Sequence, residues 1–104
     1  MNETDVFRAI ADPTRRLLLE RLATRDANAT ELRAGLSISQ PAVSQHLAVL
    51  RTAGLLRERR EGRQVRYSLA PEGLRPLQAW LLRYSAFWPQ RIDALERLLS
   101  EMDQ

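Results

Sequence analysis

Residues 39–69 read SQPAVSQHLAVLRTAGLLRERREGRQVRYSL. The first half predicts a helix, because Val43, Leu47 and Leu50 recur at the i, i+4 and i+7 spacing that gathers apolar side chains on one helix face. The second half is rich in arginine and predicts a β-hairpin. A helix that fits a groove, next to a basic hairpin, is the arrangement that reading duplex DNA requires.

Positive charge is concentrated in this same stretch. Residues 39–69 hold six Arg and two Glu, a net charge of +4, whereas the other 73 residues hold ten Arg and eleven acidic residues, a net charge of −1. Phosphate binding depends on cations clustered on one surface more than on a high total charge. We therefore expect double-stranded DNA as the partner.

The composition limits the other classes of protein. A chain of 104 residues predicts a single domain, 1–104, that is large enough to bury its own core. The absence of cysteine excludes a disulfide framework, a thiolate metal site and a cysteine nucleophile. No long apolar run and no basic leader are present, so we expect a cytoplasmic protein with no membrane partner.

Three capping signals predict where helices begin. Asp12 precedes a proline, so it is expected to end a first helix and to cap a second. Asn28 and Glu31 have the spacing of a capping box, which predicts a third, short helix over 29–35. Ser39 is a natural N-cap for the fourth helix.

The fourth helix is predicted to have a small polar face opposite its apolar one. At 100° per residue, that face carries Pro41, Ser44, Gln45, Ala48 and Thr52. Gly54 is expected to end the helix, because glycine adopts the left-handed conformation of a C-terminal cap. Residues 28–53 thus match a helix-turn-helix, in which short amide and hydroxyl side chains reach base edges.

The hairpin is predicted over 56–69. Val65, Tyr67 and Leu69 alternate with polar residues, which indicates a strand with one buried face. Residues 56–60 form the partner strand, and Glu61-Gly62 is expected to make the tight turn between them.

A helical stripe of apolar and aromatic residues covers about 72–103, and Trp88-Pro89 is expected to interrupt it. A chain this short can hardly cover such a helix by itself, so a subunit interface is favoured over a ligand pocket. The residues expected in a dimer interface are Val6, Ile10, Trp80, Tyr84, Phe87, Trp88, Ile92 and Leu95.

Neither catalysis nor metal binding is expected. Ser44 and His46 are two residues apart on a helix and point away from each other, so they form no nucleophile and base pair. His46 is the only histidine, and with no cysteine it cannot complete a four-coordinate metal site, so no cofactor is predicted. It lies at the border between the two faces of its helix, where packing and phosphate contact both stay open.

Three segments together resemble the ArsR/SmtB family of winged-helix repressors: DPTRR at 12–16, SQPAVSQHL at 39–47 and AGL at 53–55. The resemblance implies a mainly α fold with a small β-hairpin, in the order α-α-α-α-β-β-α, with a long C-terminal dimerisation helix. It further implies a homodimer on a pseudo-palindromic operator near its own promoter. Members that sense metal through the third helix would carry a Cys pair near Asn28 and Thr30, and others use Asp and His in the last helix, but neither set is complete here. The C-terminal stretch that begins FWPQR at 87–91 and runs to Leu99 resembles a metal-independent branch of the family.

The resemblance also assigns roles in DNA binding. It places Gln40, Pro41, Ser44 and Gln45 on bases or backbone, and Arg51, Arg60 and Arg63 on phosphates, and we add His46 as a candidate. Two alternatives stay open. One is a winged helix that docks an acidic protein through its arginines, and the other is a repressor that senses a small apolar inducer through its aromatic C-terminal helix.

Overall fold

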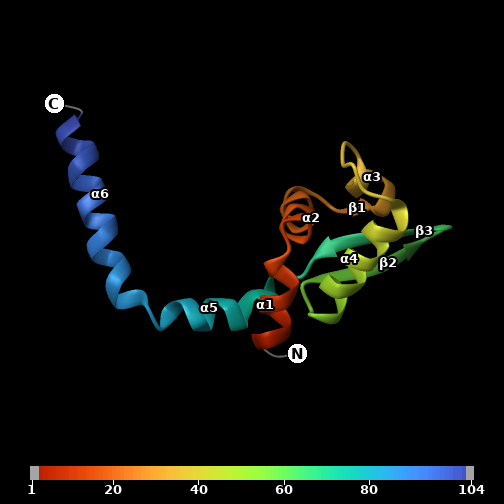
Figure 1. The fold of residues 1–104 in the computed structure, drawn as a ribbon, viewed down its shortest axis with the longest axis horizontal. Coiled ribbons are helices and arrows are strands. Elements are labelled where there is room, and N and C mark those ends of the chain that lie inside the picture. The colour runs from red at the N-terminus through yellow and green to blue at the C-terminus, as the bar shows by residue number, and fades with distance from the viewer. Residues whose placement is uncertain (1–2, 103–104) are drawn as a thin grey trace.

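The described part of the chain is mostly helical, with one small antiparallel sheet. The computed structural model describes residues 3–102, and for residues 88–94 it describes the backbone alone. In chain order the elements are α1 (Glu3–Ala11), α2 (Pro13–Thr24), β1 (Ala27–Asn28), α3 (Ala29–Arg33), α4 (Gln40–Thr52), β2 (Leu56–Glu61), β3 (Gln64–Leu69), η1 (Pro71–Leu74), α5 (Arg75–Leu82), η2 (Ser85–Phe87) and α6 (Trp88–Met102). Figure 1 shows α1 to α4 and the sheet in one body, while α5 leaves it beside α1 and α6 extends away from it.

The predicted helix starts are confirmed. The Asp12 carboxylate accepts hydrogen bonds from the backbone N–H groups of Thr14 (2.8 Å) and Arg15 (3.1 Å), so it caps α2. Asn28 and Glu31 form the reciprocal bonds of a capping box at the start of α3. This helix ends at Arg33, two residues before the predicted end at 35.

The core lies between α1, α2, α3, α4 and the first residue of β2. Its buried side chains are Val6, Ala9, Leu18, Leu22, Ala27, Leu32, Val43, Leu47, Leu50, Ala53, Leu55 and Leu56. The predicted apolar face of α4 is therefore confirmed, because Val43, Leu47 and Leu50 are all within this core. Burial of this face anchors α4 and turns its other face outward.

The sheet has one strand more than predicted. Its order is β1-β3-β2, and the short β1 pairs with β3 through Ala27 and Asn28. The hairpin turn is also shifted by one residue, since Glu61 pairs with Gln64 and leaves Gly62 and Arg63 as the turn. Gly62 has a φ of 62°, as the first position of a type II′ turn demands.

The predicted inward face of β3 packs on the core through Tyr67 and Leu69, but its polar face, which was expected to be exposed, is half-buried as well. All its residues after Gln64 are half-buried, on both faces, because β3 is the middle strand and its polar side is shielded by neighbouring side chains. Arg66, for example, lies against the carboxylates of Glu61 and Glu31.

The C-terminal helical stripe is interrupted earlier than predicted. Residues 83–87 separate α5 from α6, which begins at Trp88 with Pro89 in its first turn. A proline is tolerated there because the first N–H groups of a helix have no intrahelical partner. Within residues 3–102, no helix is both long and apolar enough to cross a membrane.

Candidate nucleic-acid interface

The outward face of α4 carries small polar side chains. Ser39 accepts a hydrogen bond from the Ala42 N–H at 3.2 Å and so fixes the start of the helix. The residues exposed on this face include Gln40, Pro41, Ser44, Gln45, Ala48 and Thr52. Side chains this short allow a helix to approach base edges closely, with the amides of Gln40 and Gln45 as donors and acceptors.

The hairpin of β2 and β3, which we call the wing, presents different arginines on its two faces. Side chains alternate along a strand, so Leu56, Glu58 and Arg60 share the face that packs on the core, while Arg57 and Arg59 lie on the other. Arg60 is therefore on the same side of the wing as α4.

Most arginines of the wing are paired with carboxylates. On the outer face, Arg57 pairs with Glu72, and Arg59 lies 3.6 Å from Glu61. Arg66 bonds the same Glu61 at 2.5 Å, which holds the pKa of that carboxyl below its usual range.

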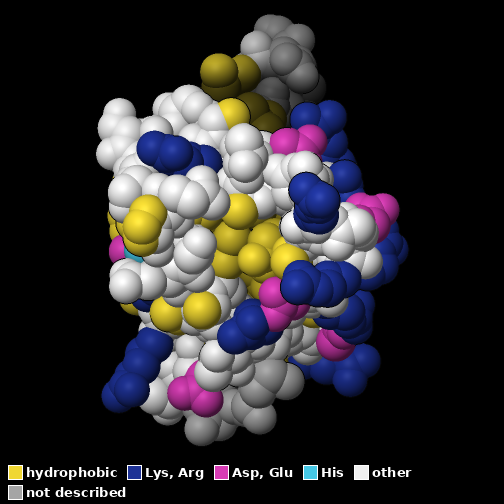
Figure 2. Space-filling model, turned by 90° about the vertical axis from the view of Figure 1, so that its right-hand side faces the viewer, with side chains coloured by type: hydrophobic (Ala, Val, Ile, Leu, Met, Phe, Trp, Pro, Cys, Tyr) yellow, Lys and Arg dark blue, Asp and Glu magenta, His cyan; other side chains and the backbone are white. Residues whose placement is uncertain are grey.

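Arg60 and Arg63 differ from these residues, because in the described part of the chain neither guanidinium has an ion pair or a hydrogen bond. Both side chains are exposed, and the strand register places Arg63 in the turn of the wing and Arg60 opposite Val65, directly before the last pair of the hairpin. The unneutralised positive charge of the wing thus lies at its tip. Viewed from that side, Figure 2 shows arginine side chains around a central apolar area, most of them on one half of the face.

Arg51 is engaged within the protein. It stands in the last turn of α4, and its guanidinium donates a hydrogen bond to the Glu58 carboxylate on β2, which raises the pKa of Arg51. Its side chain is still 51% exposed. A phosphate contact by this residue requires it to exchange the carboxylate for a phosphate oxygen.

His46 is turned toward α2. Its Nδ1 lies 3.4 Å from a terminal guanidinium nitrogen of Arg15, and the residue is half-buried. Sequence reasoning missed this contact, since the two residues are 31 positions apart and nothing local in the chain links them.

The residues expected at a dimer interface fall into four groups. Val6 was placed there wrongly, because it is 1% exposed and belongs to the core of its own chain. Trp80 of α5 is half-buried between Phe7 of α1 and Tyr84, with ring centroids 5.4 and 5.2 Å away. Ile10 is partly buried against the core, Tyr84, Phe87 and Leu95 are exposed, and the side chains of Trp88 and Ile92 lie outside the described residues.

The exposed apolar surface includes more residues than the predicted dimer interface. Along α5 and α6 it also includes Leu82, Leu98, Leu99 and Met102. Leu95, Leu98, Leu99 and Met102 have helical spacing, a signal that could have identified Leu98 as a member of the same face.

These features define a class of protein. A helix-turn-helix with an exposed polar recognition helix, followed by an arginine-tipped wing, is a winged-helix DNA-binding domain. Residues 12–58 match the model of the bacterial regulatory proteins of the arsR family. The chain belongs to the ArsR family, and it is a DNA-binding transcriptional regulator rather than an enzyme.

Individual relatives agree with this assignment. The HTH-type transcriptional regulator Rv2034 of Mycobacterium tuberculosis is 42% identical over 89% of this chain and 84% of its own length. The transcriptional repressor SdpR of Bacillus subtilis is 36% identical over 77% of this chain and 89% of its own length. A crystal structure of a possible transcriptional regulator for arsenical resistance superimposes with a TM-score of 0.70 at 39% identity, covering 93% of this chain and 95% of that one.

Proposed function

We propose that this regulator is a homodimeric repressor that binds a pseudo-palindromic operator, near its own promoter, without metal gating. The observation that supports DNA contact best is the pairing pattern of the wing, because among the described residues Arg60 and Arg63, at the tip of the wing, have no carboxylate partner. Two relatives described as repressors, SdpR and the SmtB homolog of Synechocystis, favour repression over activation.

Each candidate residue has a distinct role in this proposal. Gln40, Ser44 and Gln45 read base edges in the major groove, and Pro41 makes apolar contact at the start of the helix. The wing arginines Arg60 and Arg63, with Arg51 once it leaves Glu58, neutralise phosphates and set the register of the protein on the duplex.

Dimerisation supplies the second half-site. The exposed fractions of Leu82, Phe87 and Met102, at 58, 64 and 72%, leave an apolar face of α5 and α6 that a second copy would cover. A twofold dimer places its recognition helices about 34 Å apart in successive major grooves. The operator is then an inverted repeat.

The side chains that could bind a metal ion support the proposal that metal does not control this regulator. Cysteine is missing from the sequence, and among the residues that the structure describes no three His, Asp or Glu side chains are grouped to hold a metal ion. Because a regulator acts where the chromosome is, we place residues 1–104, as one DNA-binding domain, in the cytoplasm.

Selection of fragments from the source genome tests this function. Bound fragments should share an inverted repeat, and binding to it should weaken with salt in proportion to the phosphates contacted. Removal of divalent metal ions by a chelator should leave binding unchanged.

Three results would point elsewhere. Equal binding to all duplexes, with capture of an acidic protein, would favour a docking module. Release from DNA by an apolar metabolite that quenches tryptophan fluorescence would favour a ligand sensor. A single half-site occupied by a monomer would contradict dimerisation.

A further inference from the structure

Two neighbouring arginines of α2 donate hydrogen bonds to the free backbone carbonyls at the C-terminal end of α1. Arg15 donates to the carbonyls of Arg8 (2.8 Å) and Ala9 (2.6 Å), and Arg16 donates to those of Ile10 (2.7 Å) and Ala11 (3.2 Å). The last four carbonyls of an α-helix have no partner within it, and here all four are bonded by these two side chains.

Arg15 reaches further than Arg16. While its Nε and one terminal nitrogen bind α1, the other terminal nitrogen lies 3.4 Å from Nδ1 of His46 on α4. One planar guanidinium, carried by α2, therefore contacts both α1 and the recognition helix. Since its donors are held in a fixed fork, a shift of α1 relative to α4 would break at least one contact.

The chemistry of this contact sets the state of the histidine. A guanidinium only donates, so in a hydrogen bond between these two groups Nδ1 of His46 is the acceptor, and such a bond favours the tautomer with the ring proton on Nε2. The Asp12 carboxylate also interacts electrostatically with His46, and it is itself held by the backbone N–H groups of Arg15 and Thr14.

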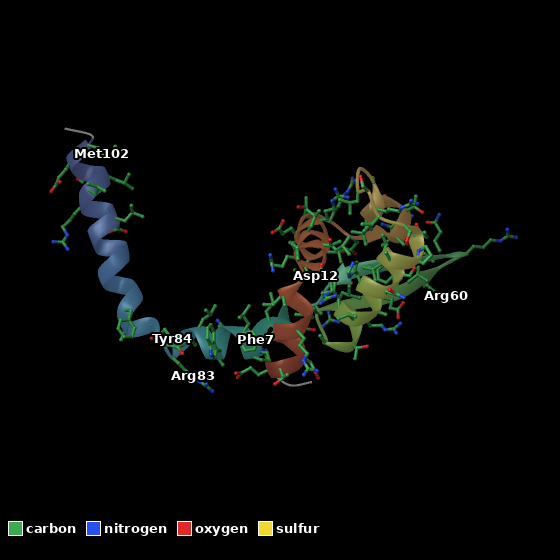
Figure 3. All side chains as sticks on the ribbon, viewed as in Figure 1. Phe7, Asp12, Arg60, Arg83, Tyr84 and Met102 are labelled. Atoms are coloured by element: carbon green, nitrogen blue, oxygen red, sulfur yellow. The ribbon has the colours of Figure 1, made fainter. Side chains whose placement is uncertain are left out.

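The opposite side of α1 contacts the aromatic end of α5. Phe7 packs edge-to-face on Trp80, which packs in turn on Tyr84. Figure 3 shows Phe7 and Tyr84 on the α5 side of the body, with Asp12 at the far end of α1. Contacts thus run from Trp80 of α5 to the Phe7 side chain of α1, and from the backbone carbonyls at the end of α1 through the Arg15 guanidinium to α4.

We propose that Arg15 and His46 are positioning residues: their contact sets the orientation of the recognition helix relative to α1 and α5. This rests on the proposed DNA-binding function and assigns His46 a role that is neither base contact nor phosphate contact. Loss of the contact weakens binding to the operator without removing a phosphate contact.

A double-mutant cycle tests the contact, with Arg16 as the matched control because it caps the same helix end but does not touch α4. Arg15→Gln and His46→Leu should each lower affinity for the selected operator about tenfold, and the double variant should be no weaker than either. Arg16→Gln combined with His46→Leu should be additive. His46→Asn keeps an acceptor where Nδ1 lies and should restore most of the affinity.

The salt dependence of binding separates this positioning role from a phosphate contact, and the thermal midpoint of unfolding separates it from a role in stability alone. Arg15→Gln and Arg16→Gln should lower the thermal midpoint similarly, since each removes hydrogen bonds to α1. Only the effect of Arg15→Gln on operator affinity should depend on which residue stands at position 46. The slope of log affinity against log salt should stay as in the wild type. Additivity of Arg15→Gln with His46→Leu, or a slope reduced by about one in His46→Leu, would overturn the proposal.

A measurement without DNA keeps the proposal testable if the proposed function fails. His46 is the only histidine, so its ring nitrogen signals in a tag-free ¹⁵N-labelled protein are unambiguous. We expect the tautomer protonated on Nε2 in the wild type and in Arg16→Gln, and a mixture of tautomers in Arg15→Gln. Identical ring spectra in the wild type and Arg15→Gln would refute the contact, whatever the protein binds.

Discussion

Arg51 in the last turn of α4 donates a hydrogen bond to Glu58 on β2, and this contact joins the recognition helix to the inner face of the wing. The Glu58 carboxylate is therefore bonded to Arg51, a residue that the resemblance to ArsR-family repressors assigns to a phosphate contact. If Arg51 binds phosphate as proposed, DNA and Glu58 compete for its guanidinium.

Removal of the Glu58 charge should therefore strengthen binding to DNA of any sequence. We expect Glu58→Gln to raise affinity about two- to fivefold, the range of an exposed ion pair, and to steepen the salt slope by about one. Glu72→Gln is the matched control, because its partner Arg57 lies on the outer face of the wing. A slope unchanged in Glu58→Gln would show that Arg51 already binds phosphate in the wild type or never does.

Arginines at the wing tip should act on all duplexes alike. Arg63→Ala is expected to lower affinity for operator and random DNA by the same factor, and to reduce the salt slope by about one, since it removes one phosphate contact. Arg59→Ala, whose side chain is paired with Glu61 on the outer face, should change the slope less. Titration of duplexes at several salt concentrations measures both, and equal slopes for the two variants would contradict the assignment.

Gln45 should control specificity instead. Gln45→Ala is expected to lose about 1 to 3 kcal/mol of discrimination between the correct and incorrect base at one operator position. Its affinity for random DNA and its salt slope should stay those of the wild type. Gln78→Ala, an exposed glutamine on α5, is the control. A uniform loss on all duplexes would place Gln45 on the backbone.

Asp12 should make stability depend on pH. The backbone N–H of Arg15, above all, lowers the pKa of Asp12 in the folded protein, so its contribution is complete above the usual aspartate pKa and is lost as the pH falls through the lowered value. Asp12→Ala should therefore have a lower thermal midpoint than the wild type at pH 7, and the difference should shrink toward pH 2. Glu20→Gln, on an exposed position of the same helix, controls for loss of a carboxylate. A difference that persists in acid would mean that the charge of Asp12 does not stabilise the cap.

Gly73 should be intolerant of any side chain. A Cβ there would lie 2.0 Å from the Gly54 carbonyl oxygen, so Gly73→Ala must push η1 away from the end of α4. We expect a loss of about 1 to 3 kcal/mol in the free energy of unfolding, measured by urea denaturation. Gly62→Ala, in open space but with a φ of 62°, should lose about 1 kcal/mol from backbone strain alone. Equal stability of Gly73→Ala and the wild type would contradict the close approach.

Local features of this chain were predictable because their partners are close in sequence. The caps at Asp12, Asn28 and Ser39 each bind N–H groups two or three residues ahead, so composition and spacing suffice to locate them. The two faces of α4 follow from the helical period alone. These features, with the clustered arginines, were enough to predict a winged helix-turn-helix and a DNA partner.

Other features depend on residues that only the tertiary structure brings together. The pairing of β1 with β3 joins positions about 40 apart, and it makes β3 the middle strand, whose polar face is half-buried as well. Within the described residues, the carboxylates that lie beside the wing arginines decide which of them are paired, and Val6 lies in the core because of how α1 packs. The guanidinium of Arg15 meets His46 for the same reason: periodicity gives the direction of a side chain, but only packing decides what it faces.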